Sequence, residues 1–117
     1  MEIKEKDIVL CKFYFSDAKK FKNRPVLVFK DNLPHDDFVG IPISSKINTM
    51  YSDEYLINNT HFIEGKIAYE SKLMIRKTFV ISKVSVVKKY ATLTDEAYNK
   101  YHNYFCSYFG CTDLESK

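Results

Sequence analysis

The sequence NRPVLVFKDNLPHDDFVGIPISSK, from Asn23 to Lys46, predicts two β-strands and the turn that connects them. Residues 25–29 and 38–43 are short apolar runs rich in β-branched side chains, which is typical of strands. Residues 31–37 between them are rich in Asp, Asn and Pro, which favour a turn. We expect this pair of strands to form the centre of the fold.

Polar residues stand at the ends of both predicted strands. Arg24 comes just before the first apolar run, and Ser44, Ser45 and Lys46 follow the second. An arginine and a hydroxyl held on neighbouring strand ends can converge on one anionic group, because the sheet fixes their separation. Such residues are also common at plain solvated strand ends, so spacing alone leaves both interpretations open.

Four further strands are expected outside this central pair, over residues 7–15, 54–57, 73–82 and 84–93. The alternation in the first of them gives one apolar face, formed by Val9, Cys11, Phe13 and Phe15. Residues 58–66 are expected to form a loop. Pro42 lies inside a predicted strand, which indicates an edge position or a bulge there.

One helix is expected after the strands. Thr94 suits its N-cap, and Asp95 and Glu96 fall in the first turn, where the helix dipole favours negative charge. Gly110 suits its end. Residues at helical spacing between these ends predict a core or interface stripe rather than a base-stacking surface: Ala97, Tyr98, Tyr101, Tyr104, Phe105 and Tyr108.

These elements predict a single domain over residues 1–117, of the α+β class and mainly β. Five or six short strands would form a small, strongly bent sheet or partly closed barrel, covered by the C-terminal helix. A chain of 117 residues can build one core without metal or disulfide staples. The three cysteines show no framework spacing, and Cys11 lies in an apolar strand, which favours a reduced core thiol.

The charge balance and the absence of long apolar stretches restrict where the protein acts. Eighteen basic and fifteen acidic side chains leave a net charge of +3, which is compatible with an anionic partner but does not require one. The first residues contain no apolar run of signal-peptide length, and no 18 consecutive apolar residues occur. A cytoplasmic protein that does not contact membranes is therefore expected.

Several classes of chemistry are disfavoured. The three histidines, His35, His61 and His102, are isolated, and no Cys or His pair has metal-ligand spacing. With three glycines the chain has no Gly-rich phosphate loop, and it has no serine-centred elbow. We therefore expect neither a metal nor another cofactor.

Metal-free cleavage of RNA remains open, because RNA carries its own nucleophile, the 2′-OH. Arg24 could stabilise the extra charge of a phosphorane-like transition state through two contacts with nonbridging oxygens. Ser44 could orient the phosphate or the 2′-OH. Residues 19–22, together with Lys46 and Arg76, could follow a single-stranded backbone. All of these could equally be ordinary solvated charges.

Four segments together resemble the MazF/PemK toxins of bacterial toxin–antitoxin pairs. DIVLCKFYFSD (residues 7–17) resembles the opening strand of that family, and KNRPVLV (22–28) resembles its KxRPxLV signature. PISSK (42–46) resembles its PITSK motif, and VKKYATLTDE (87–96) resembles its closing strand and helix start. Each motif is weak alone, but their order and spacing are fairly specific.

The resemblance implies a small SH3-like barrel with a C-terminal helix, usually as a homodimer. It implies a sequence-specific, metal-independent endoribonuclease that cuts single-stranded RNA and leaves 2′,3′-cyclic phosphate and 5′-OH ends. A cognate antitoxin protein would block the RNA groove. Arg24 and Ser44 fall on the catalytic positions of the motifs. The residues expected to bind RNA are Lys20, Lys22, Asn23, Ser45, Lys46 and Arg76.

Departures from the family pattern leave two alternatives. Lys6 replaces the usual glycine, and the acidic residue that some members carry near residues 73–77 is missing, so the general base is unassigned. A catalytically degenerate member that only binds RNA or its antitoxin is one alternative. The other is a gyrase poison like CcdB, whose action depends on a C-terminal tryptophan, whereas this chain has no Trp.

Overall fold

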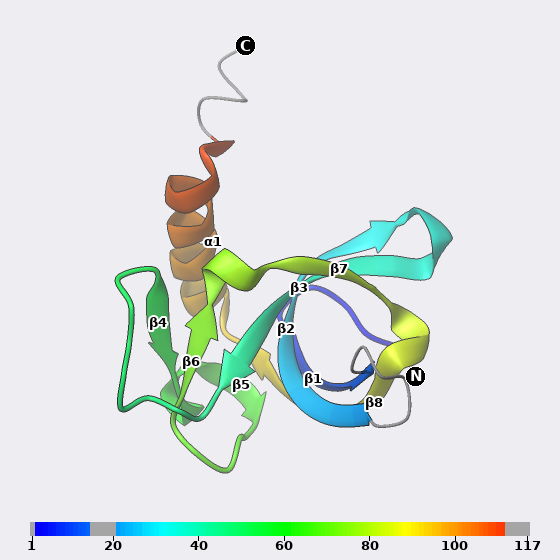
Figure 1. Ribbon diagram of the computed structural model, residues 1–117, viewed down its shortest axis with the longest axis horizontal. Helices are drawn as coiled ribbons and strands as arrows, with labels where there is room; N and C mark the ends of the chain where they lie inside the picture. Colours follow the sequence, from blue (N-terminus) through cyan, green and yellow to red (C-terminus); the bar gives the residue numbers. More distant parts are fainter. Residues whose placement is uncertain (1, 15–20, 112–117) are drawn as a thin grey trace.

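An antiparallel sheet curls into a partly open barrel, and a single helix packs beside it (Figure 1). This computed structural model describes residues 2–14 and 21–111. The strands are β1 (Asp7–Tyr14), β2 (Phe21–Leu33), β3 (Asp37–Ser44), β4 (Glu54–Ile57), β5 (Phe62–Gly65), β6 (Ser71–Met74), β7 (Phe79–Ser82) and β8 (Val86–Leu93). The helix is α1 (Asp95–Phe109), and the short 3-10 turns are η1 (Pro34–Asp36), η2 (Asn59–His61), η3 (Ile75–Lys77) and η4 (Lys83–Ser85). The mainly β half-barrel with a C-terminal helix confirms the predicted fold class.

The long hairpin of β2 and β3 lies at the centre of the sheet, as the sequence predicted. The strand order is β4-β6-β3-β2-β1-β8-β5, and β7 pairs with β3 beside this path. Val26 pairs with Pro42 and Leu27 with Ile41, and η1 makes the connection. On its other side, β3 pairs with β7 from Asp37 to Gly40 and with β6 at Ile43 and Ser44. Pro42 falls between these two pairings, so the expected edge exists only locally, in the middle of an interior strand.

The strand count and several boundaries differ from expectation. The first strand of the hairpin, β2, runs from Phe21 to Leu33 rather than over residues 25–29. Residues 73–82 do not form one strand, because η3 separates β6 from β7 and buries Ile75 in the core. Residues 58–66 are not only a loop, since they contain β5, which pairs with β8. The last strand starts at Val86 because the Ser82 hydroxyl accepts a hydrogen bond from the Val84 N–H and begins η4. The sheet therefore has eight strands rather than five or six.

Both faces of the curled sheet are buried. On the helix side, one apolar cluster contains Ile8, Leu27, Phe29, Ile41, Ile43, Ile57, Leu73, Ile75, Ala91, Leu93, Ala97 and Tyr101. The second cluster contains Ile3, Val9, Cys11, Val26, Val28 and Phe38. Successive residues of β2 point to opposite faces, so this strand supplies both clusters and holds the sheet centre rigidly.

The helix begins and ends where the sequence predicted. The Thr94 side chain accepts a hydrogen bond from the Ala97 N–H at 3.0 Å, and Gly110 ends the helix with a φ of 76°. Tyr101 is fully buried, and its hydroxyl donates to the Leu56 carbonyl at 2.6 Å. Burial raises the pKa of Tyr101 well above its ordinary value. The aromatic stripe is core, as predicted, although Tyr108 at its end is exposed. Within the described residues, no helix is long and apolar enough to cross a membrane.

Gly65 ends β5 at a position where a side chain does not fit. Its φ is +78°, and an added Cβ would collide with the Tyr90 carbonyl and come within 2.6 Å of the Ala91 Cα. We therefore expect Gly65→Ala to lower the free energy of unfolding by about 1–3 kcal/mol. Urea unfolding measures this loss, with the exposed neighbour Lys66→Ala as the control. Equal stability of the two variants would contradict the expected strain.

Candidate functional site

A cavity of about 390 Å³ opens where β2 begins and β3 ends. Its lining brings together two predicted catalytic residues, Arg24 and Ser44, with four predicted RNA-binding residues, Lys22, Asn23, Ser45 and Lys46. The remaining lining residues are Pro25, Ile43, Ile67, Ala68, Tyr69, Ser71 and Tyr90. Among the described residues, the lining therefore carries three cationic side chains and no carboxylate.

The pairing of β2 with β3 explains why Arg24 and Ser44 meet. Val26 lies opposite Pro42, so the same register continued by two residues puts Arg24 beside Ser44. Each residue has a second neighbour that fixes its strand. Arg24 lies opposite Cys11 of β1, and Ser44 lies opposite Lys72 of β6. Arg24 and Ser44 thus lie on interior strands rather than on a loop.

Arg24 is half-buried and available to an anion. In the part of the chain that the structure describes, its guanidinium makes no hydrogen bond or ion pair. Its pairing partner Cys11 is a buried free thiol, as predicted, and burial raises the pKa of that thiol to about 11. An arginine without a partner keeps its donors for a ligand with two acceptor oxygens, such as a phosphate.

Ser44 has a defined local role beside Arg24. Its Oγ accepts a hydrogen bond from the Lys46 N–H at 3.2 Å, which turns the chain sharply at the end of β3. The hydroxyl proton is left to donate to a ligand. The same turn brings Ser45 and Lys46 to the exposed rim of the cavity.

The remaining predicted residues separate into three groups. Lys22 and Asn23 are exposed on the rim, opposite Phe13 and Lys12 of β1. Lys20 lies outside the described residues. Arg76 belongs to η3 and does not line the cavity.

The environment of Arg76 differs from that of Arg24. Its guanidinium contacts the Asp53 carboxylate at 3.3 Å and lies 5.2 Å from the centre of the Tyr51 ring. The guanidinium that the sequence predicts to bind RNA therefore already contacts an acidic and an aromatic side chain. The structure therefore gives Arg76 a local partner away from the cavity.

The sequence interpretation missed the wall formed by Ile67, Ala68, Tyr69 and Tyr90. The first three lie in the loop between β5 and β6, and Tyr90 lies in β8. No local motif marks them, because they reach the cavity only through the pairing of distant strands. The one available signal was an Ile-Ala-Tyr run after Gly65, in a stretch to which the sequence assigned no element.

The described lining of this cavity offers neither a carboxylate nor an imidazole. Over residues 2–14 and 21–111, no group of three or more His, Cys, Asp and Glu side chains could hold a metal ion. The chemistry that the described lining offers is therefore binding and charge stabilisation of an anion.

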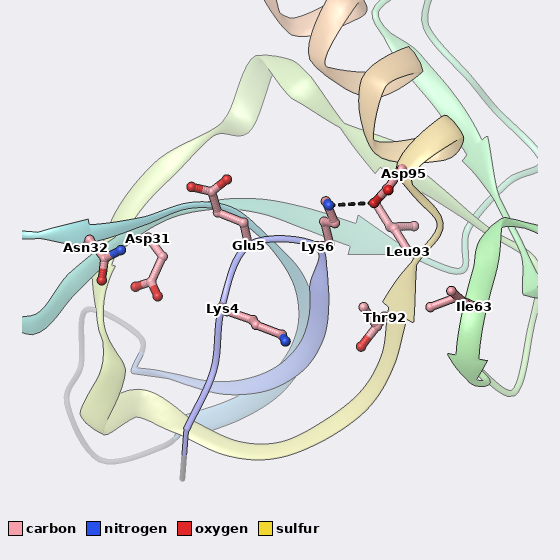
Figure 2. Close-up of a pocket in the computed structure, with 9 residues that line it drawn as sticks. All are labelled: Lys4, Glu5, Lys6, Asp31, Asn32, Ile63, Thr92, Leu93 and Asp95. Atoms are coloured by element: carbon pink, nitrogen blue, oxygen red, sulfur yellow. Dashed lines mark hydrogen bonds and ion pairs between the residues drawn. The ribbon is translucent and has the colours of Figure 1, made fainter.

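Figure 2 shows a second cavity, of about 400 Å³, between the N-terminal segment, β2 and β8. Four of its five charged side chains are already paired. Lys6 contacts Asp95 at 2.6 Å, Asp31 contacts Lys83 at 2.9 Å, and Glu5 lies 3.8 Å from Lys30. The lining holds two lysines and three carboxylates, so its net charge disfavours a polyanion. The Arg24 cavity is the better candidate site.

Comparison with family models decides the class of protein. The model of the PemK-like, MazF-like toxins of type II toxin–antitoxin systems matches residues 4–109. This chain belongs to that family. The matched segment of this PemK/MazF-like toxin contains Arg24, Ser44 and the whole cavity wall. Membership implies an antitoxin protein as a partner.

A solved structure shows the same fold for this PemK/MazF-like toxin. Toxin MazF-mt6 of Mycobacterium tuberculosis superposes with a TM-score of 0.65 at 16% sequence identity. The match covers 89% of this chain and 96% of that chain, and it is one of 36 matching chains. At this identity the similarity shows the fold alone. Comparison with curated proteins gave no match.

Proposed function

We propose that this toxin is a metal-independent endoribonuclease that cleaves single-stranded RNA. One observation carries the proposal: an arginine with no partner among the described residues and a serine hydroxyl share a cavity whose described lining contains cations but no carboxylate. This arrangement suits a phosphodiester, whose two nonbridging oxygens accept hydrogen bonds from a guanidinium. The family and its fold agree with such an activity.

The proposed reaction uses the nucleophile that RNA supplies. The 2′-oxygen attacks the adjacent phosphorus, the bond from phosphorus to the 5′-oxygen breaks, and a 2′,3′-cyclic phosphate and a 5′-OH result. Arg24 stabilises the added negative charge on the nonbridging oxygens. A guanidinium is not a general base in proteins, so we do not assign that role to Arg24. Ser44 donates a hydrogen bond that orients the phosphate or the 2′-OH.

Proton transfer relies on groups outside the described lining. The 2′-OH loses a proton and the leaving 5′-oxygen gains one. Since the described lining offers no carboxylate or imidazole, we assign both transfers to water. General acid–base catalysis typically contributes 10²–10⁴-fold, so we expect this enzyme to turn over slowly.

The partners follow from the same surface. Lys22 and Lys46 would contact phosphates on either side of the scissile one, while Asn23 and Ser45 would contact sugars or base edges. We propose a homodimer that acts in the cytoplasm, and an antitoxin that inhibits it by covering this cavity. Lys20 is proposed to contribute to RNA binding as well.

Cleavage of a mixed-sequence RNA by the purified protein in excess EDTA tests the function. We expect internal cuts that leave 2′,3′-cyclic phosphate and 5′-OH ends, as mapped by end-specific ligation and phosphatase treatment. A parallel RNA with every 2′-OH methylated should stay intact, because its nucleophile is blocked. Loss of cleavage in EDTA that Mg²⁺ restores would contradict the metal-independent reaction.

A catalytically degenerate RNA-binding member is the second candidate. The absence of a carboxylate or imidazole from the described lining favours it. Both candidates predict that the methylated RNA binds, so cleavage of unmodified RNA distinguishes them. Binding without cleavage of unmodified RNA at any salt concentration would establish the degenerate member.

A further inference from the structure

We propose that Tyr69 is a stacking surface for a nucleobase next to the phosphate held by Arg24. The inference rests on the proposed function, because it assigns a base-binding residue to the same cavity. Tyr69 lies in the loop between β5 and β6, far in sequence from the strands that carry Arg24 and Ser44. The fold nevertheless brings all three residues into the lining of one cavity.

The Tyr69 ring is exposed to solvent. The side chain is 73% exposed, and within the described residues the ring makes no aromatic contact and the hydroxyl no hydrogen bond. Other tyrosines have partners. Tyr55 stacks on Tyr104 with their ring centres 3.9 Å apart. Tyr90, which lines the same cavity as Tyr69, has the Lys88 ammonium 5.4 Å from its ring centre. Tyr69 is therefore the cavity aromatic with a free face.

Exposure alone would mean little, because single exposed apolar side chains are common. What distinguishes Tyr69 is that its backbone is fixed. Its carbonyl accepts a hydrogen bond from the Ser71 hydroxyl at 2.9 Å, and Ser71 is buried. The Ile67 N–H donates to the Asn59 side chain at 2.9 Å, which fixes the loop on the other side.

Two further hydrogen bonds complete the support of this loop. The Asn58 amide donates to the Glu70 carboxylate at 2.9 Å, and the Lys66 N–H donates to the Tyr90 carbonyl at 3.2 Å. A ring held in solvent by a fixed backbone loses little conformational entropy when a ligand stacks on it. The loop thus presents the ring in advance of binding.

The chemistry of the cavity matches an unstacked base. Pro25, Ile43 and Ile67 give it apolar surface, while Arg24 and the two lysines form its charged part. A nucleobase in single-stranded RNA has flat apolar faces and polar edges, and proteins commonly bind it by stacking on an aromatic side chain. Asn23 lies on the rim, where its amide can meet a base edge. Phosphate on Arg24 and base on Tyr69 would thus be bound together.

Binding of RNA to Tyr69→Ala, Tyr69→Phe and wild type tests this assignment. The probe is a short, mixed-sequence single-stranded RNA with all 2′-OH groups methylated, so no cleavage is needed. We expect Tyr69→Ala to weaken binding about tenfold and Tyr69→Phe to bind like wild type, since the ring rather than the hydroxyl stacks. Tyr108→Ala, an exposed tyrosine outside the cavity, is the matched control and should bind normally.

Fluorescence of 2-aminopurine gives a direct readout of stacking. With this base placed on either side of the mapped cleavage position, wild type and Tyr69→Phe should quench one of the two probes, and Tyr69→Ala should not. If wild type binds RNA and Tyr69→Ala binds and quenches equally, the stacking assignment is wrong while the ribonuclease proposal stands. If wild type binds no RNA, both are wrong.

Discussion

Replacing Arg24 by alanine is expected to lower the rate of RNA cleavage by about two to three orders of magnitude. Arg24 is the only arginine in the cavity lining. Its guanidinium has no partner among the described residues, so its donors are free for the phosphate. Those donors matter most in the transition state, where the nonbridging oxygens gain charge. The loss should therefore appear mainly in kcat, measured by single-turnover cleavage with saturating protein.

Two companion variants sharpen this prediction. Arg24→Lys keeps the charge but loses the two-point contact, so we expect a rate between those of wild type and Arg24→Ala. Arg76→Ala removes an arginine that contacts Asp53 outside the cavity, and it should cleave at nearly the wild-type rate. Thermal unfolding of Arg24→Ala should match wild type, because the guanidinium makes no hydrogen bond or ion pair with the described residues. Wild-type cleavage by Arg24→Ala would refute the site assignment.

Replacing Lys72 by methionine is expected to lower the free energy of unfolding by about 3 kcal/mol. The Lys72 ammonium contacts the Glu54 carboxylate at 2.9 Å and the Thr49 carbonyl at 2.7 Å, and both charged side chains are more than nine-tenths buried. Its removal would leave Glu54 as a buried charge with one remaining hydrogen bond, from the Tyr51 N–H. Urea unfolding at neutral pH measures the loss.

The pH dependence identifies Glu54 as the origin of that loss. Burial by itself would raise the pKa of Glu54, but hydrogen bonds from the Tyr51 N–H and Lys72, with the charges of Lys72 and Arg76, hold it below its ordinary value. A lowered folded-state pKa stabilises the fold above the unfolded-state value and ceases to do so as the pH falls through the folded-state value. The difference between wild type and Lys72→Met should therefore shrink below about pH 4.

A surface ion pair provides the control for Lys72→Met. Lys30 lies 3.8 Å from Glu5, with side chains 63% and 36% exposed, so Lys30→Met should cost less than about 1 kcal/mol. A similar loss in both variants, or a loss in Lys72→Met that is independent of pH, would contradict the role of the buried pair.

The parts of the fold that depend on local pattern were predictable. The β2–β3 hairpin, the Thr94 cap and the Gly110 end follow from runs of apolar residues and from turn and capping chemistry within a few positions. The division of residues 73–82 into β6 and β7 did not follow. It depends on β3 offering different neighbours to each half and on a core position for Ile75. The polar residues Arg76, Lys77 and Thr78 interrupt the apolar ones there, but by themselves they do not distinguish a turn from exposed positions of one strand.

The candidate site shows the same division. Arg24 and Ser44 were predictable as neighbours because one hairpin carries both, and the register follows from the hairpin. Tyr69 and Tyr90 were not, since strand pairings between distant parts of the chain bring them to the cavity. The position of Arg76 was not predictable either. Its charge suggested RNA, but its position in η3 puts it beside Asp53 and Tyr51.

The pairing of β1 with β8 also has a consequence for synthesis of the toxin. The ribosome makes β1 first, but β8 is the neighbour that completes one side of it, and β8 follows almost eighty residues later. Tyr90 of that late strand also belongs to the cavity wall. A nascent chain that has not reached β8 therefore has an incomplete site, even though Arg24 and Ser44 have already been translated. The candidate site of this toxin is therefore incomplete until nearly all of the described fold has been translated.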